Sequence, residues 1–190
     1  MEYRVLGRTG LRVSALAFGC GDVGGLMVRG APADRERAVA RAIELGINYL
    51  DTAPSYGSGE SEKNLGQVLR ALRPSVIVGT KWRLVARDLA DVAGAVARSV
   101  ETSLARLGLE RVDLLHLHNL IGRVGDERPL GVGRVLEAVV PAVRRLQDQG
   151  KVRLFAVTAS PQPGPPHRAL GSAGLAPAQA VSNLLNPTGA

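Results

Sequence analysis

A carboxylate and a phenol stand five residues apart in the stretch DTAPSYG, residues 51–57. Asp51 ends an apolar run, and Tyr56 follows one short loop later. A phenol with an ordinary pKa of about 10 is a poor proton donor at neutral pH, but a neighbouring ammonium stabilises its phenolate. Lys81 ends a second apolar run and can supply that ammonium. Asp51 can neutralise and position the lysine, because a partly buried ammonium is costly unless it is paired.

A histidine after a third apolar run completes the set. The imidazole of His118 can offer an N–H to a carbonyl oxygen. Tyr56 would then act as a general acid, and His118 would orient a carbonyl whose carbon receives a hydride. No nucleophile–base pair competes convincingly, and no spacing of Cys, His and carboxylate residues predicts a metal site. His116 has the same strand parity, and we interpret it as a buried core histidine.

Composition predicts a single soluble domain over residues 1–190. The chain is 45% apolar with a net charge of +7 carried almost wholly by scattered arginines. No basic patch with interleaved aromatic residues is present, which argues against a nucleic-acid partner. Cys20 is the only cysteine, so no intrachain disulfide can form. The sequence shows no signal peptide and no apolar run of about 18 residues, so we expect a cytoplasmic protein outside the membrane.

The pattern along the chain predicts alternating strands and helices after an N-terminal β-hairpin, residues 3–6 and 11–13. The expected strands are residues 14–18, 47–51, 76–81, 112–118, 154–158 and 179–185. The expected helices are residues 33–45, 61–72 with Ser61 as N-cap, 88–107 and 132–149, with a weak one near 167–170. Helices between successive strands imply right-handed βαβ units and a parallel sheet.

Glycines after the first expected strand match the dinucleotide fingerprint G-x-G-x-x-G at residues 19–24. That fingerprint requires a helix that begins on the glycines, so that its N-terminus faces the pyrophosphate. Gly25, Gly30 and Pro32 are expected to prevent a helix until about Ala33. We therefore do not interpret these glycines as a Rossmann motif.

Polar residues at strand ends favour a closed (β/α)₈ TIM barrel over an open doubly wound sheet. One such residue lies at or near the end of each of five successive strands: Asp51, Lys81, His118, Thr158 and Gln179. In a barrel these edges converge on one mouth, whereas in an open sheet only residues at the switch point share a ligand. The sequence therefore predicts a site at the C-terminal mouth of a barrel.

The number of units predicts an incomplete barrel. About six βα units fill the 190 residues, whereas a barrel of this kind typically needs about 250. Loops after strands seven and eight, which commonly bind phosphate in such barrels, would be missing. We expect a C-terminally truncated chain, a fragment with impaired cofactor binding.

Motifs over essentially the whole chain resemble the aldo-keto reductase family. They are DTAPSYG with SEKNLG behind it, VGTKW, VDLLHLHN, GKVRLFAVTA and QAVSNLLNP, after an opening LGRTGLRVSALAFGCG similar to the family's hairpin and first strand. The resemblance implies a (β/α)₈ barrel that binds NADP(H) at its C-terminal mouth. It also implies hydride transfer between the nicotinamide and an aldehyde or ketone. Carried over by position, Tyr56 resembles the proton donor, Lys81 and Asp51 the pair that tunes it, and His118 the orienting histidine.

Cofactor and substrate contacts are expected from the same resemblance and from the strand ends. The expected cofactor contacts are Gly21, Asp51, Thr158 and Gln179. Substrate is expected to contact Tyr56, His118 and Trp82, with Leu120 as a further lining residue. Two departures from the family pattern stand out: Thr158 and Ala159 replace the usual Ser-Asn, and Ser182 replaces a frequent tyrosine.

Two alternative functions stay open at the level of sequence. A lysine at a strand end also suits Schiff-base chemistry, so Lys81 would serve a barrel lyase or aldolase. The other alternative is a non-catalytic partner or cofactor-sensing subunit that keeps the fold. In each case the substrate pocket would be shaped by βα loops such as residues 119–130.

Overall fold

The computed structural model describes residues 1–119, 121–122, 130–158 and 178–179. Its centre is a six-stranded parallel sheet with the order β10-β9-β6-β5-β4-β3. The strands are β3 (Phe18–Gly19), β4 (Tyr49–Asp51), β5 (Ile77–Trp82), β6 (Val112–Leu117), β9 (Val152–Thr158) and β10 (Ala178–Gln179). Strands of this sheet neighbour one another in chain order, without the reversal that marks the switch point of a doubly wound sheet. This order agrees with the predicted barrel class.

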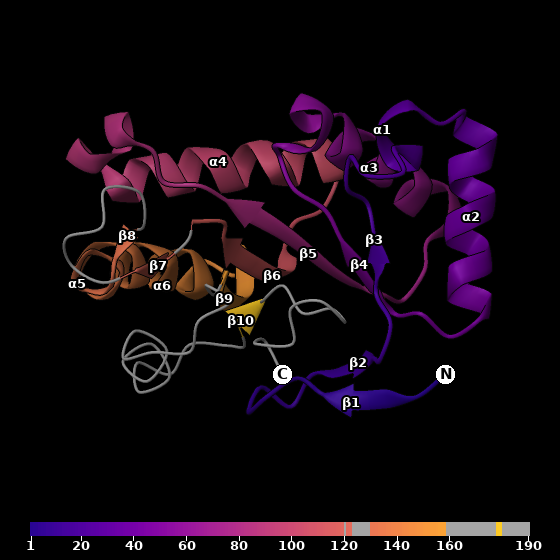
Figure 1. Cartoon of the computed structure of the whole chain (residues 1–190), viewed down its shortest axis with the longest axis horizontal. Coiled ribbons are helices and arrows are strands. Elements are labelled where there is room, and N and C mark those ends of the chain that lie inside the picture. Colours follow the sequence, from indigo (N-terminus) through magenta and orange to yellow (C-terminus); the bar gives the residue numbers. More distant parts are fainter. Residues whose placement is uncertain (120, 123–129, 159–177, 180–190) are drawn as a thin grey trace.

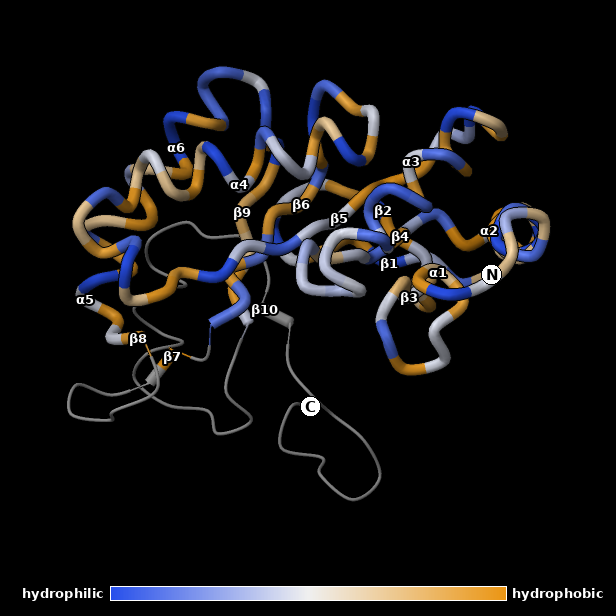
Figure 2. The backbone as a smooth tube through the Cα atoms, turned by 90° about the horizontal axis from the view of Figure 1, so that it is seen from above, coloured by the Kyte–Doolittle hydropathy of each residue, from blue (hydrophilic) through white to orange (hydrophobic). Residues whose placement is uncertain are grey.

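Helices lie along one side of the sheet, as Figures 1 and 2 show for α3, α4 and α6. The helical segments are α1 (Leu26–Arg29), α2 (Pro32–Glu44), η1 (Tyr56–Gly59), α3 (Glu60–Leu72), η2 (Ala86–Ala90), α4 (Val92–Leu107), α5 (Val132–Arg134), the π-helical η3 (Val135–Val139) and α6 (Val140–Asp148). The expected hairpin is confirmed as β1 (Tyr3–Val5) and β2 (Arg12–Ser14), paired antiparallel. A two-stranded parallel ribbon joins β7 (Ile121–Gly122) and β8 (Leu130–Gly131). No described helix is long and apolar enough to cross a membrane.

Alternate strand residues face two different cores, because successive side chains of a strand point to opposite faces. One set packs against the helices in the larger core and includes Leu50, Val78, Leu115 and Phe155. The other set, with Ile77, Leu114 and Ala156, packs against Leu11 and Val13 next to the hairpin. The hairpin therefore covers the N-terminal part of the sheet face opposite the helices. The same face continues toward the C-terminal strand ends.

Two expectations near the N-terminus are wrong. The strand expected over residues 14–18 is only Phe18–Gly19, because Ser14 pairs with the hairpin and Leu16 is 64% exposed. The helix expected to begin near Ala33 is preceded by the one-turn helix α1, which starts directly after Gly25. Gly25 adopts a left-handed conformation with φ of 65° and serves as the N-cap of α1, so the glycine starts a helix there instead of preventing one.

The start of α3 also differs from the prediction. Gly59, not Ser61, is the N-cap, and Ser61 lies buried in the first turn. Its hydroxyl donates to the carbonyl of Cys20 at 2.8 Å and lies 2.8 Å from the hydroxyl of Thr52. The serine therefore ties α3 to the segments that follow β3 and β4, a tertiary use that local capping rules do not predict.

Two longer helices are interrupted. The helix expected from residue 88 begins at Val92, where the carboxylate of Asp91 accepts the backbone N–H of Gly94 at 2.8 Å. The helix expected over residues 132–149 contains a π-helical segment before Pro141, which sits in the first turn of α6 and there needs no backbone N–H. Residues 180–185 of the last expected strand and the weak helix near 167–170 lie outside the described residues.

A buried ionic contact ties α3 to α4. The carboxylate of Glu62 is fully buried, with one oxygen 3.1 Å from Nη1 of Arg106. The other oxygen accepts a hydrogen bond from the hydroxyl of Thr80 at 2.7 Å. Removing the arginine would leave a buried carboxylate with one neutral partner, which is a large penalty in a protein interior.

We expect Arg106→Met to lower the free energy of unfolding by about 2 kcal/mol, below the usual cost of breaking a buried pair because 27% of the arginine side chain is exposed. Urea unfolding followed by circular dichroism measures the change. The matched control is Arg41→Met, whose ion pair with Glu44 is exposed and should contribute less than about 0.5 kcal/mol. If the two substitutions lowered the free energy of unfolding equally, the stabilising role of the buried contact between Glu62 and Arg106 would be contradicted.

Candidate active site

The loop that carries Tyr56 is held in place by its glycines and by α1. Tyr56 donates its backbone N–H to the carbonyl of Ala53 at 3.1 Å and opens the short helix η1. Gly57 follows with φ of 57°, a left-handed conformation that favours glycine. A Cβ on Gly57 would also clash with a methyl group of Val28. The close approach of α1, a helix the sequence prediction missed, therefore sets how the loop projects Tyr56.

A buried ion pair lies beneath this loop. Nζ of Lys81 donates to Oδ2 of Asp51 at 2.6 Å and to the carbonyl of Thr52 at 3.0 Å. The lysine side chain is 2% exposed. An ammonium buried to this degree is stable in the protein only when it is paired and hydrogen-bonded. The two acceptors satisfy that requirement, and the parallel pairing of β4 with β5 brings them to it.

The ion pair, the phenol and the expected histidine meet at the C-terminal ends of β4, β5 and β6. Nζ of Lys81 lies 4.8 Å from the centroid of the Tyr56 ring. The ring of His118 stands edge-on to that of Tyr56, with centroids 6.5 Å apart and an interplanar angle of 85°. The structure therefore brings together Asp51, Tyr56, Lys81 and His118, as the sequence predicts.

Backbone contacts between the loops after β5 and β6 position His118. Its N–H donates to the carbonyl of Trp82 at 2.6 Å, and its own carbonyl accepts Nε of Arg83 at 3.3 Å. The side-chain amide of Asn119 both accepts from the N–H of Leu84 and donates to its carbonyl, each at 2.9 Å. These contacts fix the backbone on both sides of the histidine ring.

Electrostatics keep His118 neutral near physiological pH. Burial lowers the pKa of the half-buried imidazole, and the charges of Lys81 and Arg83 lower it further, against the opposing effect of Asp51. A neutral imidazole retains one N–H donor and loses the charge that would repel the nearby ammonium. His118 is therefore suited to orient a carbonyl oxygen without competing with Lys81.

Cys20 and Gly21 line the side of the site next to β3. The backbone N–H of Cys20 donates to the carbonyl of Asp51 at 2.8 Å. Burial raises the pKa of the Cys20 thiol to about 12, so it is not a thiolate nucleophile at neutral pH. A Cβ on Gly21 would lie 3.7 Å from Cζ of Tyr56. The glycine thus leaves open the space beside the carbon that bears the phenol oxygen.

Thr158 and Gln179 are the remaining expected cofactor contacts, and they are neighbours in register on β9 and β10. The hydroxyl of Thr158 is buried and has no hydrogen-bond partner within the described part of the chain. A buried hydroxyl without a partner is costly, which suits a position where a ligand supplies the partner. Thr158 therefore fits a cofactor contact. Leu120, Ala159 and Ser182 lie outside the described residues.

Trp82 is not brought to the site, which corrects the expected substrate contact. The residue is 3% exposed and packs in the core between sheet and helices. The physical reason is strand alternation: Lys81 points toward the site, so the next side chain points to the opposite face. A hydrophobic residue at a strand end is not evidence of a pocket when its side chain points to the face opposite the one that holds Lys81.

Two residues that the sequence prediction did not place in the site contact it from below. The hydroxyl of Tyr49 donates to Oδ1 of Asp51 at 3.2 Å and lies 3.2 Å from Nε2 of His116. His116 is buried, as expected for a core histidine, but it belongs to a polar network. The sequence did carry a signal for Tyr49. Tyr49 and Asp51 are two residues apart on one strand, so their side chains share a face of the sheet.

No group of three or more His, Cys, Asp and Glu residues that could hold a metal ion occurs among residues 1–119 and the other described segments.

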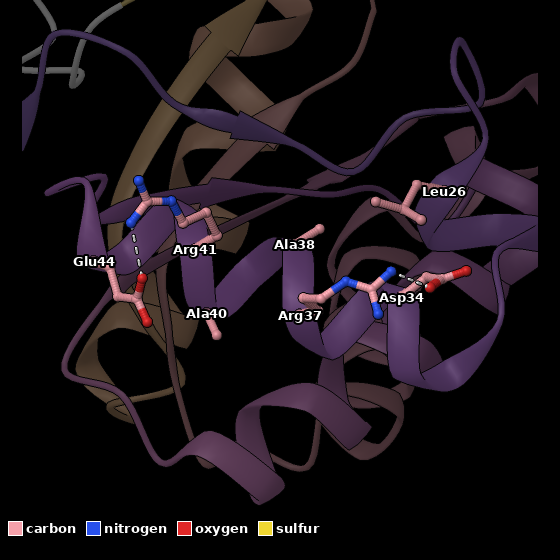
Figure 3. A pocket seen from close by; sticks show the side chains of 7 residues that line it. All are labelled: Leu26, Asp34, Arg37, Ala38, Ala40, Arg41 and Glu44. Carbon is pink, nitrogen blue, oxygen red and sulfur yellow. Dashed lines mark hydrogen bonds and ion pairs between the residues drawn. The ribbon is translucent and has the colours of Figure 1, made fainter.

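An open pocket elsewhere lies against α2 (Figure 3) and is lined by Leu26, Asp34, Arg37, Ala38, Ala40, Arg41 and Glu44. Its charged residues pair with each other, Arg37 with Asp34 and Arg41 with Glu44. This pocket shares no residue with the polar cluster at the strand ends.

The parallel strand order, the helical cover and the polar residues at the strand ends define a protein of the (β/α)-barrel class with a site at the C-terminal edge. Residues 15–187 match the aldo/keto reductase family. The chain belongs to this family.

Curated relatives include L-galactose dehydrogenase of Arabidopsis thaliana, 37% identical over 164 residues that cover 85% of this chain and 49% of that protein. Pyridoxal 4-dehydrogenase of Microbacterium luteolum is 34% identical over 65% of this chain and 44% of its own length. The chain therefore spans about half the length of the curated relatives it matches.

Solved structures of the family are similar as well. The glycerol dehydrogenase of Gluconobacter oxydans is 27% identical with a TM-score of 0.72, over 98% of this chain and 56% of that one. An aldo-keto reductase of Klebsiella pneumoniae in complex with NADPH is 26% identical with a TM-score of 0.66, over 90% of this chain and 54% of that one. What this chain shares with them is part of the family's (β/α)₈ barrel, a parallel sheet covered by helices.

Burial of His116 predicts a pH dependence of stability. Burial lowers the pKa of the folded-state imidazole from 6.5 to about 4, with Lys81 and His118 acting in the same direction and Asp51 opposing. Below pH 6.5 the unfolded chain binds this proton and the folded chain does not, so stability falls as the pH falls from 6.5 to 4. The loss attributable to this group is up to about 3 kcal/mol.

Urea unfolding at pH 7.5, 6, 5 and 4.5 measures this loss in the wild type and in His116→Gln, whose amide nitrogen can replace the Nε2 donor. Carboxylates lose stability in the same acidic direction in both proteins, so the difference between the two isolates the imidazole. We expect the variant to show the shallower decline between pH 6.5 and 4.5. If the free energy of unfolding fell equally with pH in both proteins, the burial of a neutral His116 would be contradicted.

Proposed function

We propose that this site transfers a hydride between NADP(H) and an aldehyde or ketone, or in reverse from the corresponding alcohol, with Tyr56 as the proton donor. The observation that carries the proposal is the position of the Lys81 ammonium, 2.6 Å from the Asp51 carboxylate and 4.8 Å from the centre of the Tyr56 ring. Membership of the aldo/keto reductase family and a similar structure in complex with NADPH support it.

Each residue of the cluster has a role that its surroundings allow. The O–H of Tyr56 donates its proton to the substrate oxygen, and the ammonium of Lys81 stabilises the phenolate that results. Asp51 keeps the buried lysine charged. Neutral His118 offers an N–H that orients the carbonyl and stabilises the charge that develops on its oxygen.

The residues present fit a nicotinamide cofactor. When bound, NADPH supplies the hydride, and NADP⁺ accepts it in the reverse direction. The buried hydroxyl of Thr158 that lacks a partner can bind an amide group, and Gln179 adjoins it in register. Gly21 leaves space beside the phenol of Tyr56. Thr158 and Gln179 lie on the neighbouring strands β9 and β10, whereas Gly21 follows β3 at the other edge of the sheet, so a ligand that reaches all three must be extended.

The geometry does not favour Lys81 as a Schiff-base nucleophile. Imine formation requires a neutral, accessible amine. Nζ of Lys81 is instead buried and donates to both Asp51 and Thr52. The lyase alternative would require this ion pair to break before each reaction.

We expect Tyr56→Phe to lower kcat for carbonyl reduction by at least about 100-fold, because the general acid is removed while the ring remains. Loss of NADPH absorbance measures turnover with D,L-glyceraldehyde as the first carbonyl substrate, and gain of NADPH absorbance measures the reverse direction with NADP⁺ and L-galactose. Binding of NADPH, followed by its fluorescence, should change less than two-fold.

Tyr3→Phe is the matched control, since Tyr3 is an exposed tyrosine of the hairpin whose hydroxyl donates to the carbonyl of Gly46, away from the candidate site. It should leave kcat unchanged. Turnover by Tyr56→Phe at the wild-type rate would remove the proposed mechanism. NADPH binding without turnover by the wild type on any carbonyl would favour the non-catalytic alternative, and a borohydride-trapped adduct on Lys81 would favour the lyase.

A further inference from the structure

One side chain spans from β4 across β5 to β6, directly beneath the candidate catalytic cluster. Tyr49 begins on β4, and its hydroxyl reaches Nε2 of His116 on β6 at 3.2 Å. The strand between them, β5, has Gly79 at the crossing point. A Cβ on Gly79 would lie 2.7 Å from the hydroxyl oxygen of Tyr49 and 2.9 Å from Cε2. The missing side chain of Gly79 is therefore what allows Tyr49 to bridge the sheet.

The donor and the acceptor of each hydrogen bond in this bridge can be assigned. The ionised carboxylate of Asp51 accepts hydrogen bonds only, so the single hydroxyl proton of Tyr49 goes to Oδ1 of Asp51. The oxygen of Tyr49 must then accept from His116, which places the imidazole proton on Nε2. Nδ1 of His116 carries no proton in this tautomer, and it is buried without a hydrogen-bond partner in the described segments.

The surroundings hold both groups of the bridge in their neutral forms. Burial, followed by the nearby carboxylate of Asp51, raises the pKa of Tyr49. Burial lowers the pKa of His116 to about 4, with a further lowering from Lys81 and His118. The titratable groups that act on the pair are Asp51 on β4, Lys81 on β5, His118 after β6 and Tyr56 in the β4–α3 loop.

The bridge completes the coordination of Asp51. Lys81 binds Oδ2 at 2.6 Å, and Tyr49 binds Oδ1 at 3.2 Å. A carboxylate with one partner can turn about its terminal bond, whereas one held at both oxygens has a fixed plane. The direction in which Lys81 is drawn, and therefore its distance from the Tyr56 ring, depends on that plane.

We propose that Tyr49 and His116 are positioning residues of this site: His116 orients the hydroxyl of Tyr49, which holds Asp51 so that Lys81 stays beside Tyr56. Gly79 is the third member of the arrangement, because it provides the space for Tyr49. The catalytic consequence rests on the proposed function, whereas the geometry of the pair does not. Asp51 is the member of the candidate site to which Tyr49 donates, and His116 reaches Asp51 through the Tyr49 hydroxyl, so both residues act through Asp51.

The kinetic test is Tyr49→Phe, which keeps the ring and removes the hydroxyl. Loss of one hydrogen bond to a charged group should lower kcat roughly ten-fold, with KM for the carbonyl substrate within about two-fold. His116→Leu should give a similar decrease, and His116→Gln should recover most of it because its amide can donate from the position of Nε2. If His116 had only a structural role, kcat would not be high in His116→Gln and low in His116→Leu.

Gly79→Ala supplies a double-mutant cycle. In the single variant Gly79→Ala, the new methyl group displaces the Tyr49 hydroxyl. This variant should lower kcat about as much as Tyr49→Phe does. In the Tyr49→Phe background the same substitution should cost much less, because the displaced hydroxyl is already absent. Additive losses would show that Gly79 acts independently of Tyr49 and would overturn its part in the proposal.

Two NMR measurements test the geometry without any turnover. The chain has three histidines and three lysines, so ¹⁵N signals of the rings and ammonium groups can be resolved and assigned with single variants. At pH 7 we expect His116 as the Nε2–H tautomer and a slowly exchanging ammonium signal from Lys81. The signals of Lys63 and Lys151, whose ammonium groups are more exposed, serve as internal controls. In Tyr49→Phe the His116 tautomers should mix, and the Lys81 signal should broaden.

These readouts separate the two hypotheses. An inactive wild type with the expected tautomer and with Lys81 broadening in Tyr49→Phe would remove the proposed function and keep the positioning pair. An active wild type with His116 protonated on Nδ1, or with Tyr49→Phe and His116→Leu both at wild-type kcat, would overturn the pair and keep the function. If Tyr49→Phe does not fold, the comparison of His116→Leu with His116→Gln decides the question.

Discussion

The structure of the site depends on one buried ion pair, between Lys81 and Asp51. Each charge would cost several kcal/mol to bury alone, so neither residue can be placed on its strand without the other. The pair is stable because its remaining hydrogen-bonding capacity is also used: Lys81 donates to the carbonyl of Thr52, and Asp51 accepts from Tyr49. The ammonium that is held this way lies over the ring of Tyr56, and the rest of the cluster is arranged around it.

Parallel strands with alternating side chains make this arrangement possible. The face opposite the helices is apolar at its N-terminal end, where the hairpin covers it, and polar at its C-terminal end. The change occurs within single strands, as in β5, where Ile77 packs with the hairpin and Lys81 forms the ion pair. Apolar packing and the candidate site are thus divided between the two ends of the same face, as in barrel proteins generally.

Several features of the fold and site could be predicted because they rest on local patterns. Apolar runs ending in Asp51, Lys81 and Thr158 mark strand ends, and the helices between them impose parallel order. Predictions failed where a distant contact overrides the local preference. Ser61 bonds to Cys20 instead of capping α3, α1 forms between glycines against the Tyr56 loop, and Trp82 faces the helices. The catalytic roles of the residues brought together stay predictions.

The sequence by itself determined the alternation of the main strands and helices and placed Asp51, Lys81 and Thr158 at strand ends, since hydrophobic period and turn residues act over a few neighbouring positions. Only the tertiary structure decided which side chains meet. Tyr49 and His116 are 67 residues apart, and their contact requires the register of three strands together with the missing side chain of Gly79. Contacts of this kind depend on distances of a few ångströms between strands, which no local pattern in the chain encodes.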